Sequence, residues 1–163
     1  MNVKFRDYKD SDFNIIKQGI EGLMDHIVKM DPLKRQRRMH AYSKNYTKNL
    51  VSKVKKNKGL ILIAYEHENI VGFIAGFIEK QSKENLLECV PTKAGRIDDL
   101  FVYPEYRSKN IGRLLMKKIE NYFKKNGCDV IKLNVFTPNI RAHEFYKKLN
   151  YQDRLVGMIK LIK

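Results

Sequence analysis

A short segment past the middle of the chain holds the residue types best suited to chemistry. Two adjacent carboxylates, Asp98 and Asp99, stand before an apolar Leu-Phe-Val run, and a basic turn follows at residues 107–112. Apolar residues then recur at helical spacing, so the segment predicts a strand, a tight turn and a helix. The first turn of a helix presents unpaired backbone N–H groups and the positive end of the helix dipole, which attract anions. Three cations surround this turn: Arg107, Lys109 and Arg113.

Phosphate is the ligand that this turn predicts. Gly112, near its end, lets the backbone come close to a bound group. The spacing matches neither GxxxxGK[ST] nor GxGxxG, so it does not support binding of nucleoside triphosphates or dinucleotides. An ordinary basic turn without a ligand is the alternative that the pattern alone leaves open.

The rest of the chain predicts the elements that must position this segment. Strands are expected at residues 3–8, 60–65, 70–79, 96–103, 130–136 and 155–162, which are rich in β-branched and apolar residues. Helices are expected from Phe13 to the Asp31-Pro32 pair, from Met39 to Gly59, from Ile111 to Gly127 and over a short stretch after Pro138. In the second helix, Tyr42, Tyr46 and Leu50 are read as apolar positions. Residues 81–95 are polar and predict a long loop on the substrate side.

Length and composition indicate one globular unit. The chain has 163 residues, 43 % of them hydrophobic, which is enough for one packed core. No repeat, linker or low-complexity tract interrupts it, so residues 1–163 are expected to form a single domain. The longest apolar runs fall short of the roughly 20 residues that span a bilayer. Because the first ten residues interleave charges of both signs, unlike a signal peptide, a cytoplasmic location is expected.

The cysteines and histidines predict no metal site and no thiol nucleophile. Cys89 and Cys128 are too few for a disulfide framework and lack zinc-ligand spacing. Read as free thiols, they agree with a reducing compartment. The four histidines likewise show no ligand spacing.

The net charge indicates a second possible class of function, the binding of an anionic partner. There are 33 Lys and Arg against 18 Asp and Glu, a formal balance of +15. Basic runs at residues 34–38 and 53–58 support an alternative reading as a nucleic-acid or anionic-surface binder. However, the lysines are spread along the whole chain, and charge runs are usually solvated helix faces. Nucleic acid is therefore disfavoured as the main partner, and no membrane partner is expected.

Two stretches of the sequence resemble motifs of one family. Residues 97–116, IDDLFVYPEYRSKNIGRLLM, resemble the acetyl-CoA-binding motif [RQ]xxGx[GA] of the GNAT superfamily of N-acyltransferases, and residues 139–151, NIRAHEFYKKLNY, resemble its second motif. The layout of elements fits almost the whole chain, although the first 60 residues match in pattern only. Asn110 and Asn150 stand where the motifs have Gly. After Gly, Asn best tolerates the left-handed backbone conformation.

The resemblance implies a fold and a cosubstrate. The fold is mixed α/β (α+β), with a mostly antiparallel central sheet of about six or seven strands, splayed at the acetyl-CoA site and flanked by about four helices. The implied acetyl-CoA-binding residues are Leu100, Phe101, Val102, Arg107, Ser108, Lys109, Asn110, Ile111, Gly112, Arg113, Asn139, Ala142 and Tyr146.

The resemblance also implies a base. An acceptor amine arrives as an ammonium ion with a pKa of about 10.4 and must lose a proton before it attacks a thioester. By resemblance to the polyamine acetyltransferases, Asp98 is the first choice, acting directly or through water. Asp99 is the alternative base, or the anchor of the ammonium ion. Because strand side chains alternate, only one of the two is expected to face the substrate. Either could instead simply pair with a Lys or Arg.

Two further roles follow from the resemblance. Backbone N–H groups near Phe101 and Val102 would stabilise the negative charge on the thioester oxygen. Tyr146 matches the family's general acid, which protonates the departing CoA thiolate, and a phenol is protonated at neutral pH. The other role open to Tyr146 is that of a core aromatic beside Phe145.

The implied function is transfer of an acetyl group from acetyl-CoA to a primary amine by direct attack in a ternary complex. A GNAT-like sensor that binds acyl-CoA without turnover is a further alternative. The acceptor stays open between a small-molecule amine and a peptide or protein amine. A homodimer is one option for the oligomeric state.

Overall fold

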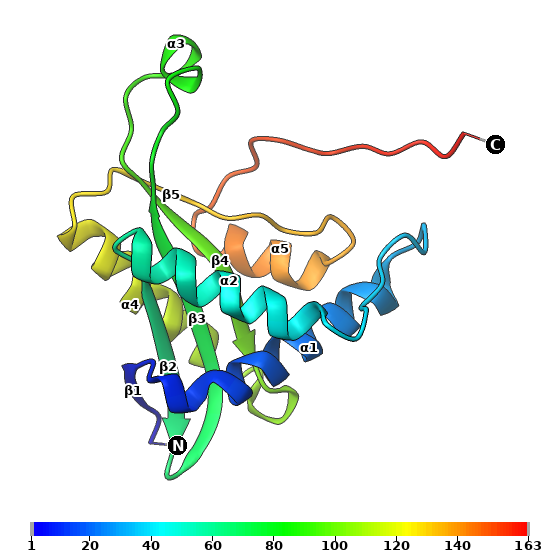
Figure 1. Cartoon of the computed structure of the whole chain (residues 1–163), viewed down its shortest axis with the longest axis vertical. Coiled ribbons are helices and arrows are strands. Elements are labelled where there is room, and N and C mark those ends of the chain that lie inside the picture. Colours follow the sequence, from blue (N-terminus) through cyan, green and yellow to red (C-terminus); the bar gives the residue numbers. More distant parts are fainter. Residues whose placement is uncertain (1, 163) are drawn as a thin grey trace.

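A five-stranded sheet forms the centre of the protein. The structure is a computed structural model that describes residues 2–162 (Figure 1). The strands are β1 (Lys4–Asp7), β2 (Leu60–Glu66), β3 (Asn69–Glu79), β4 (Ala94–Val102) and β5 (Val130–Lys132), and they lie in the sheet in chain order. Neighbours from β1 to β4 are antiparallel, whereas β5 runs parallel to β4.

β4 and β5 separate soon after they meet. Their pairing joins Ala94 to Val130, Gly95 to Ile131 and Arg96 to Lys132. β4 then continues to Val102, whereas the chain after Lys132 leaves the sheet. The second half of β4 therefore has one side without a strand partner among the described residues, which is the splayed opening that the resemblance implied.

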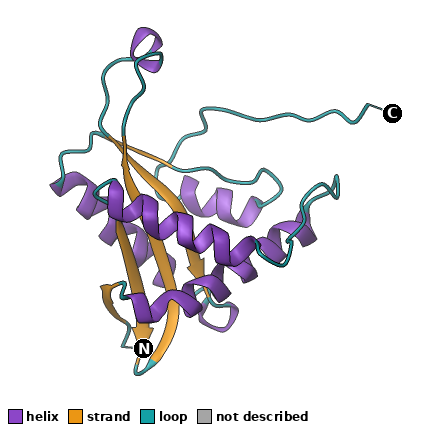
Figure 2. Cartoon of the chain, viewed as in Figure 1, coloured by secondary structure: helices purple, strands orange, loops and turns teal. Residues whose placement is uncertain are grey.

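Helices cover both faces of the sheet. α1 (Phe13–Met30) and α2 (Tyr42–Lys56) pack on one face, and α4 (Ile111–Lys125) and α5 (Ile140–Lys147) pack on the other. Short 3-10 turns, η1 (Asp10–Asp12) and η2 (Pro104–Tyr106), precede α1 and follow β4. A four-residue helix, α3 (Asn85–Glu88), lies in the protruding connection between β3 and β4 (Figure 2).

The side chains of β2 alternate between the two faces of the sheet and so contribute to two separate parts of the core. Leu62 and Ala64 pack with α4, while Ile61 and Ile63 pack with α1 and α2. The α4 side is filled chiefly by Leu115, Met116, Ile119 and Phe123, and the α1–α2 side by Ile16, Ile20, Leu50 and Phe101.

Two glycines let α4 lie close to the sheet. A Cβ at Gly95 of β4 would overlap the ring of Phe123, and a Cβ at Gly76 of β3 would lie 2.9 Å from that ring. Phe123 itself is fully buried. The C-terminal half of α4 is thereby held against the β3–β4 pair.

Most elements agree with the sequence-based expectations. α1, α2, α4, α5 and the strands β1 to β4 form where periodicity predicts them. The strand expected at residues 130–136 ends at Lys132, because β4 has diverged by then and no longer offers a neighbour. The loop expected at residues 81–95 contains α3.

The strand expected at residues 155–162 is wrong. Residues 152–162 form no helix or strand and lead away from the body of the protein (Figures 1 and 2). The sheet therefore has five strands instead of six or seven. Apolar, β-branched residues favour a strand, but a strand also needs a neighbour for its backbone hydrogen bonds, and within residues 2–162 this segment has none.

Candidate active site

A β-bulge places both adjacent carboxylates on one side of β4. Across β3 and β4, Ala75 pairs with Asp99 and Gly76 with Ile97, so Asp98 has no partner of its own. A bulge interrupts the alternation of side chains along a strand. Asp98 and Asp99 both bond to residues of α2, so the expectation that they point to opposite faces is wrong.

Asp98 is held by two cations. Its carboxylate lies 3.4 Å from Lys53 Nζ on α2 and 3.7 Å from Arg96 Nε on its own strand. The side chain of Asp98 is 14 % exposed. Asp98 thus has the ion-pairing role that the sequence left open for either carboxylate.

Asp99 accepts a hydrogen bond from a tyrosine. Tyr46 Oη, on α2, lies 3.1 Å from one carboxylate oxygen of Asp99 and 3.3 Å from the other. Burial, and then the negative charge of Asp98, raise the pKa of Asp99 to about 7, although the Tyr46 hydrogen bond and the charge of Lys53 oppose this rise. Asp99 can therefore take up a proton near neutral pH.

Tyr46 stays protonated and so remains a donor. Burial, followed by the charges of Asp99 and Asp98, raises the pKa of Tyr46 well above its ordinary value. Its ring centroid lies 5.5 Å from that of Tyr42, one turn earlier in α2. Sequence reasoning read Tyr46 only as an apolar position, because its hydroxyl gains a partner only when β4 packs beneath the helix.

Tyr146 lies on α5 between two aromatic rings. Its ring centroid is 5.3 Å from that of Phe145 and 5.9 Å from that of Tyr151. Burial, and then the negative charge of Asp99, raise the pKa of Tyr146 to about 12. The hydroxyl is thus protonated at neutral pH and is within electrostatic reach of Asp99.

The peptide groups of β4 alternate between β3 and the splayed opening. Tyr103 N–H donates to Val71 O on β3 at 3.1 Å, so the peptide group of Val102 faces away from β3. Arg107 Nε donates to Val102 O at 3.0 Å from that other side. By the same alternation, the N–H groups of Leu100 and Val102 point into the opening, whereas that of Phe101 points to β3.

The turn before α4 uses left-handed backbone. Ser108 has φ +62° and Asn110 has φ +63°. In the next element, Leu114 N–H donates to Asn110 O at 3.1 Å. The N–H groups of Ile111, Gly112 and Arg113 precede this bond and, by helix geometry, have no carbonyl within the helix. Asn110 adopts the conformation for which the family motif uses Gly, and Asn150 does the same with φ +66°.

Several cations gather at this turn. Arg107 is fixed by its bond to Val102 O. Arg141 of α5 donates to Ser108 Oγ at 3.1 Å. Lys109 Nζ lies 5.2 Å from the centre of the Tyr106 ring. Arg141 was missed by sequence reasoning, although it stands inside the second motif and could have been read there as an additional cation.

Asn139 and Ala142 form the beginning of α5. Asn139 Oδ1 accepts the N–H of Ala142 at 3.2 Å, which caps the helix. A Cβ at Gly112 would lie 3.4 Å from Phe145, so the first turn of α4 meets the second half of α5. The structure thus brings the sequence-predicted residues of β4, the turn and α5 together around the splayed opening.

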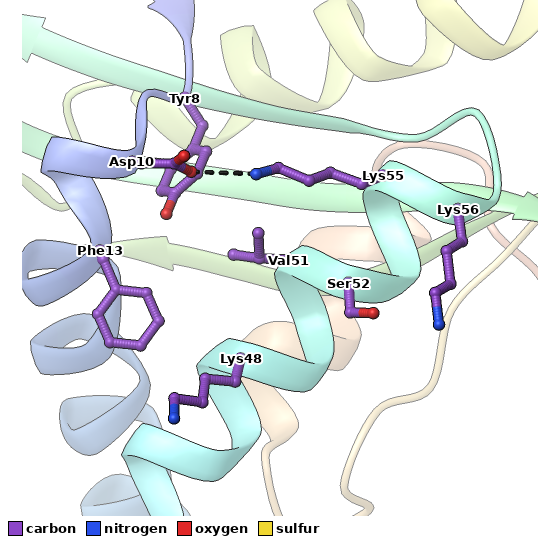
Figure 3. A pocket seen from close by; sticks show the side chains of 8 residues that line it. All are labelled: Tyr8, Asp10, Phe13, Lys48, Val51, Ser52, Lys55 and Lys56. Atoms are coloured by element: carbon purple, nitrogen blue, oxygen red, sulfur yellow. Dashed lines mark hydrogen bonds and ion pairs between the residues drawn. The ribbon is translucent and has the colours of Figure 1, made fainter.

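Two hollows border α2. One, of about 320 Å³, is lined by Asp98 of β4 and by residues of α2 and its end: Tyr46, Asn49, Leu50, Ser52, Lys53, Lys56 and Asn57. The larger, of about 490 Å³, lies between the start of α1 and the outer side of α2, where Lys55 pairs with Asp10 (Figure 3). Of the sequence-predicted site residues, Asp98 lines the smaller hollow and none lines the larger one.

Residues 2–162 contain neither a candidate metal site nor a candidate membrane-spanning helix. Within residues 2–162, no three side chains of the His, Cys, Asp or Glu type are grouped so that they could share a metal ion. No helix in that range has both the length and the hydropathy to cross a bilayer.

The model of the Acetyltransferase (GNAT) family matches residues 21–151, which include every site residue named above. The chain belongs to the GNAT acetyltransferase family. Among its GNAT relatives is an uncharacterised N-acetyltransferase of Methanocaldococcus jannaschii, with 33 % identity over 98 residues, 57 % of this chain and 40 % of that protein. Another is the thialysine N-epsilon-acetyltransferase of Bos taurus, with 39 % identity over 57 residues, 35 % of this chain and 34 % of that protein. The matches thus span less than half the length of these relatives.

Solved GNAT-like structures confirm the fold. A mutant of the BH1408 protein from Bacillus halodurans superimposes with a TM-score of 0.82 at 22 % identity, covering 98 % of this chain and 99 % of that one. An aminoglycoside N-acetyltransferase in complex with CoA superimposes with a TM-score of 0.73 at 12 % identity, covering 98 % and 95 %.

Proposed function

We propose that this GNAT protein transfers an acetyl group from acetyl-CoA to a primary amine by direct attack of the amine in a ternary complex. The observation that carries the proposal is the arrangement along β4. Asp99, with a pKa near neutrality, is followed within three residues by peptide groups that face the splayed opening, and the strand leads into a cationic turn. One strand thus joins a base, hydrogen-bond donors and a phosphate-suited turn.

The residues present fit acetyl-CoA. Its pyrophosphate would bind at the turn through the N–H groups of Ile111, Gly112 and Arg113 and through the side chains of Arg107, Lys109 and Arg141. The open side of β4 offers Leu100 N–H and Val102 N–H to the pantetheine arm and to the thioester. Bound there, acetyl-CoA would supply the activated acetyl group.

Asp99 is the base in this proposal. Its raised pKa lets the carboxylate accept a proton from the acceptor ammonium near neutral pH, where a catalytic base is most effective. Asp98, although first choice by resemblance, is engaged by Lys53 and Arg96. Asp98 instead contributes the negative charge that raises the pKa of Asp99 and helps to hold a cationic acceptor.

In this proposal, β4 stabilises the negative charge that develops during the reaction, and α5 donates a proton to the leaving group. As the amine attacks, negative charge develops on the thioester oxygen, and the N–H group of Leu100 or Val102 donates to it. Tyr146 Oη then gives its proton to the departing sulfur, since a phenol with a pKa of about 12 is protonated at neutral pH. As the C–S bond breaks, the nitrogen of the new amide gives up its second proton, which restores the hydroxyl of Tyr146, and the proton taken up by Asp99 returns to solvent.

The acceptor is an amine in this proposal. The names of two similar proteins mention thialysine and aminoglycosides, both of which carry amino groups. In this proposal the amine approaches through the hollow lined by Asp98 and by Tyr46, the hydrogen-bond partner of Asp99. A small-molecule amine and a peptide or protein amine both remain in the proposed substrate class.

A thiol-release assay tests the proposal. Acetyl-CoA is incubated with the protein and a panel of polyamines, thialysine, aminoglycosides, amino acids and short peptides. At least one amine should release CoA thiol in a protein-dependent manner and gain 42 mass units, about the mass of one acetyl group in place of a proton. Binding of acetyl-CoA without release for any amine would favour a sensor. A salt-sensitive shift of nucleic acid without acetyl-CoA binding would favour the nucleic-acid reading.

A further inference from the structure

The smaller hollow beside α2 carries more positive than negative charge. Lys53 and Lys56 line it, and Asp98 is the only acidic side chain among the described residues that do so. Asp98 is already paired with Lys53 at 3.4 Å and with Arg96 at 3.7 Å, so these two cations balance its charge. An ammonium ion that approaches Asp99 through this hollow therefore meets a net positive charge.

Lys53 lies at the border of the hollow and keeps donors for another partner. Its Nζ lies 3.4 Å from Asp98 and 5.8 Å from the centre of the Phe77 ring on β3, so the side chain turns from α2 toward the sheet. The side chain of Lys53 is 55 % exposed. An ammonium group has three N–H donors, and the contact with Asp98 leaves others available to a further anion.

The end of α2 does not need its lysines to satisfy its own carbonyl groups. Lysines near a helix C-terminus often bond to the last carbonyls. Here Lys53 O accepts from Asn57 N–H at 3.0 Å and from Asn57 Nδ2 at 2.9 Å. In the same way, Val54 O accepts from Gly59 N–H at 2.9 Å. The ammonium groups of the last turn are therefore free to face outward.

Lys55 and Lys56 are neighbours in this last turn but differ in what they face. Lys55 Nζ pairs with Asp10 at 3.1 Å beside the larger hollow. Figure 3 shows the Lys56 side chain directed away from that pair, and Lys56 lines both hollows. Within residues 2–162, no carboxylate lies at ion-pair distance from Lys56. Lys56 is thus an unpaired cation at the smaller hollow.

Neutral hydrogen-bonding groups complete the lining of the smaller hollow. The amides of Asn49 and Asn57 and the hydroxyl of Ser52 border it together with the two lysines. Amide, hydroxyl and ammonium groups can all donate to the oxygens of a carboxylate or a phosphate, and the bonds from ammonium are the stronger ones. The lining therefore suits an anion next to the place where an amine would meet Asp99.

We propose that the acceptor is an amine that also carries an anionic group, a carboxylate or a phosphate, bound at Lys53 and Lys56 while the amine reaches Asp99. This inference rests on the proposed acetyl transfer and narrows its substrate class. The anionic group supplies the negative charge that the lysines lack. An amino acid, an acidic peptide or a phosphorylated amine fits this site, whereas a polyamine brings only further positive charge.

Matched pairs of amines test the substrate class. The thiol-release assay compares β-alanine with β-alaninamide, phosphoethanolamine with ethanolamine, and amidated Ala-Glu-Glu with amidated Ala-Gln-Gln. In at least one pair the anionic member should have a lower KM, by about 10-fold or more, the effect expected for one charge-assisted hydrogen bond. The pair that responds distinguishes carboxylate from phosphate and small molecule from peptide. Neutral members or spermidine used as well as the anionic members would overturn the proposal.

Charge reversal at Lys56 locates the anion. Lys56 is chosen because the charge of Lys53 also lowers the pKa of Asp99. Lys56→Glu should raise the KM of the anionic member by about 10- to 100-fold and leave that of its neutral partner within about twofold. Lys55→Glu is the matched control, because it makes the same charge change in the same helical turn beside the larger hollow. Thermal unfolding shows that both variants fold, and equal effects of the two on KM would overturn the proposal.

Binding without turnover separates this inference from the proposed acetyl transfer. Calorimetry titrates both members of each pair into the protein saturated with CoA, which carries no acetyl group to transfer. The anionic member should bind more tightly, and Lys56→Glu should remove this preference. Failure of every amine to release thiol would contradict acetyl transfer, and the binding preference would still support the anion site. Equal binding of anionic and neutral members would overturn the anion site itself.

Discussion

Tyr46 Oη on α2 lies 3.1 Å from a carboxylate oxygen of Asp99 on β4, and this bond joins a helix on the sheet face to the strand that lines the proposed acetyl-CoA site. The hydrogen bond lowers the pKa of Asp99, against the larger effect of burial. Tyr46 is thus a positioning residue that also adjusts the proton affinity of the proposed base.

The variant Tyr46→Phe should move the pH profile of the enzyme. With the hydroxyl gone, the pKa of Asp99 rises further, so the acid limb of kcat/KM should shift to higher pH while the rate at high pH is largely kept. Tyr42→Phe is the control, because Tyr42 packs on Tyr46 but donates no hydrogen bond to Asp99. Identical profiles for Tyr46→Phe and the unchanged protein would contradict this role.

Asp99→Asn should change how stability depends on pH. Between about pH 4, the ordinary pKa of an Asp in an unfolded chain, and pH 7, the folded protein holds a proton on Asp99 that the unfolded chain has released. The free energy of unfolding therefore falls as pH rises through this window, by at most about 1.4 kcal/mol per pH unit from this group. An Asn side chain does not ionise, so in Asp99→Asn this residue adds no pH dependence to the free energy of unfolding.

Urea unfolding at pH 5 and pH 7 measures this difference. The stability of Asp99→Asn relative to the unchanged protein should increase from pH 5 to pH 7. Other carboxylates, such as Asp12 with its Arg6 partner, titrate alike in both proteins and cancel in the comparison. A relative stability that is the same at both pH values would mean that Asp99 has an ordinary pKa.

Tyr146→Phe separates chemistry from packing. The ring and its contacts with Phe145 and Tyr151 are kept, so the KM for acetyl-CoA should change little. Loss of a general acid should lower kcat by about 10²- to 10⁴-fold. Tyr151→Phe, whose hydroxyl bonds to Glu120 instead, is the matched control and should keep most of its turnover. Wild-type turnover in Tyr146→Phe would leave Tyr146 as a core aromatic.

Charge reversal at the turn tests the phosphate site. Arg107→Glu places a carboxylate beside the proposed pyrophosphate position and should weaken acetyl-CoA binding by about 10- to 100-fold, the range expected for losing one charge-assisted hydrogen bond. Titration calorimetry measures the affinity, and thermal unfolding without ligand shows whether folding is affected. Arg37→Glu, on the exposed α1–α2 connection, is the control for the change in net charge. Equal losses in both variants would argue against a localised site.

Most of the fold could be predicted from the sequence because its elements are strongly periodic. The stripe from Ile111 to Phe123 predicts α4, and four of its residues are buried together with Met116: Ile111, Leu115, Ile119 and Phe123. The turn at Asn110 was also predictable, since a residue that tolerates left-handed backbone stands where the conformation requires one.

What could not be predicted depends on pairing between distant residues. The bulge at Asp98 shifts one carboxylate onto the α2 side, and the sequence of β4 alone carries no sign of it. Tyr46 has no visible polar role until Asp99 lies beneath it. Residues 155–162 have a clear strand propensity, but whether another strand lies beside them depends on residues elsewhere in the chain.

Phe123 packs closely over Gly95, so the C-terminal end of α4 is fixed against the sheet. The helix is anchored where β4 meets β5, and its first turn, which packs against Phe145, lies about 18 Å away, twelve residues at about 1.5 Å each. A tilt of α4 at this anchor would cause a larger displacement at the other end of the helix, where the cationic turn would bind its ligand. The distance between that turn and Asp99 therefore depends on the absence of a side chain at Gly95, a position that no ligand would touch.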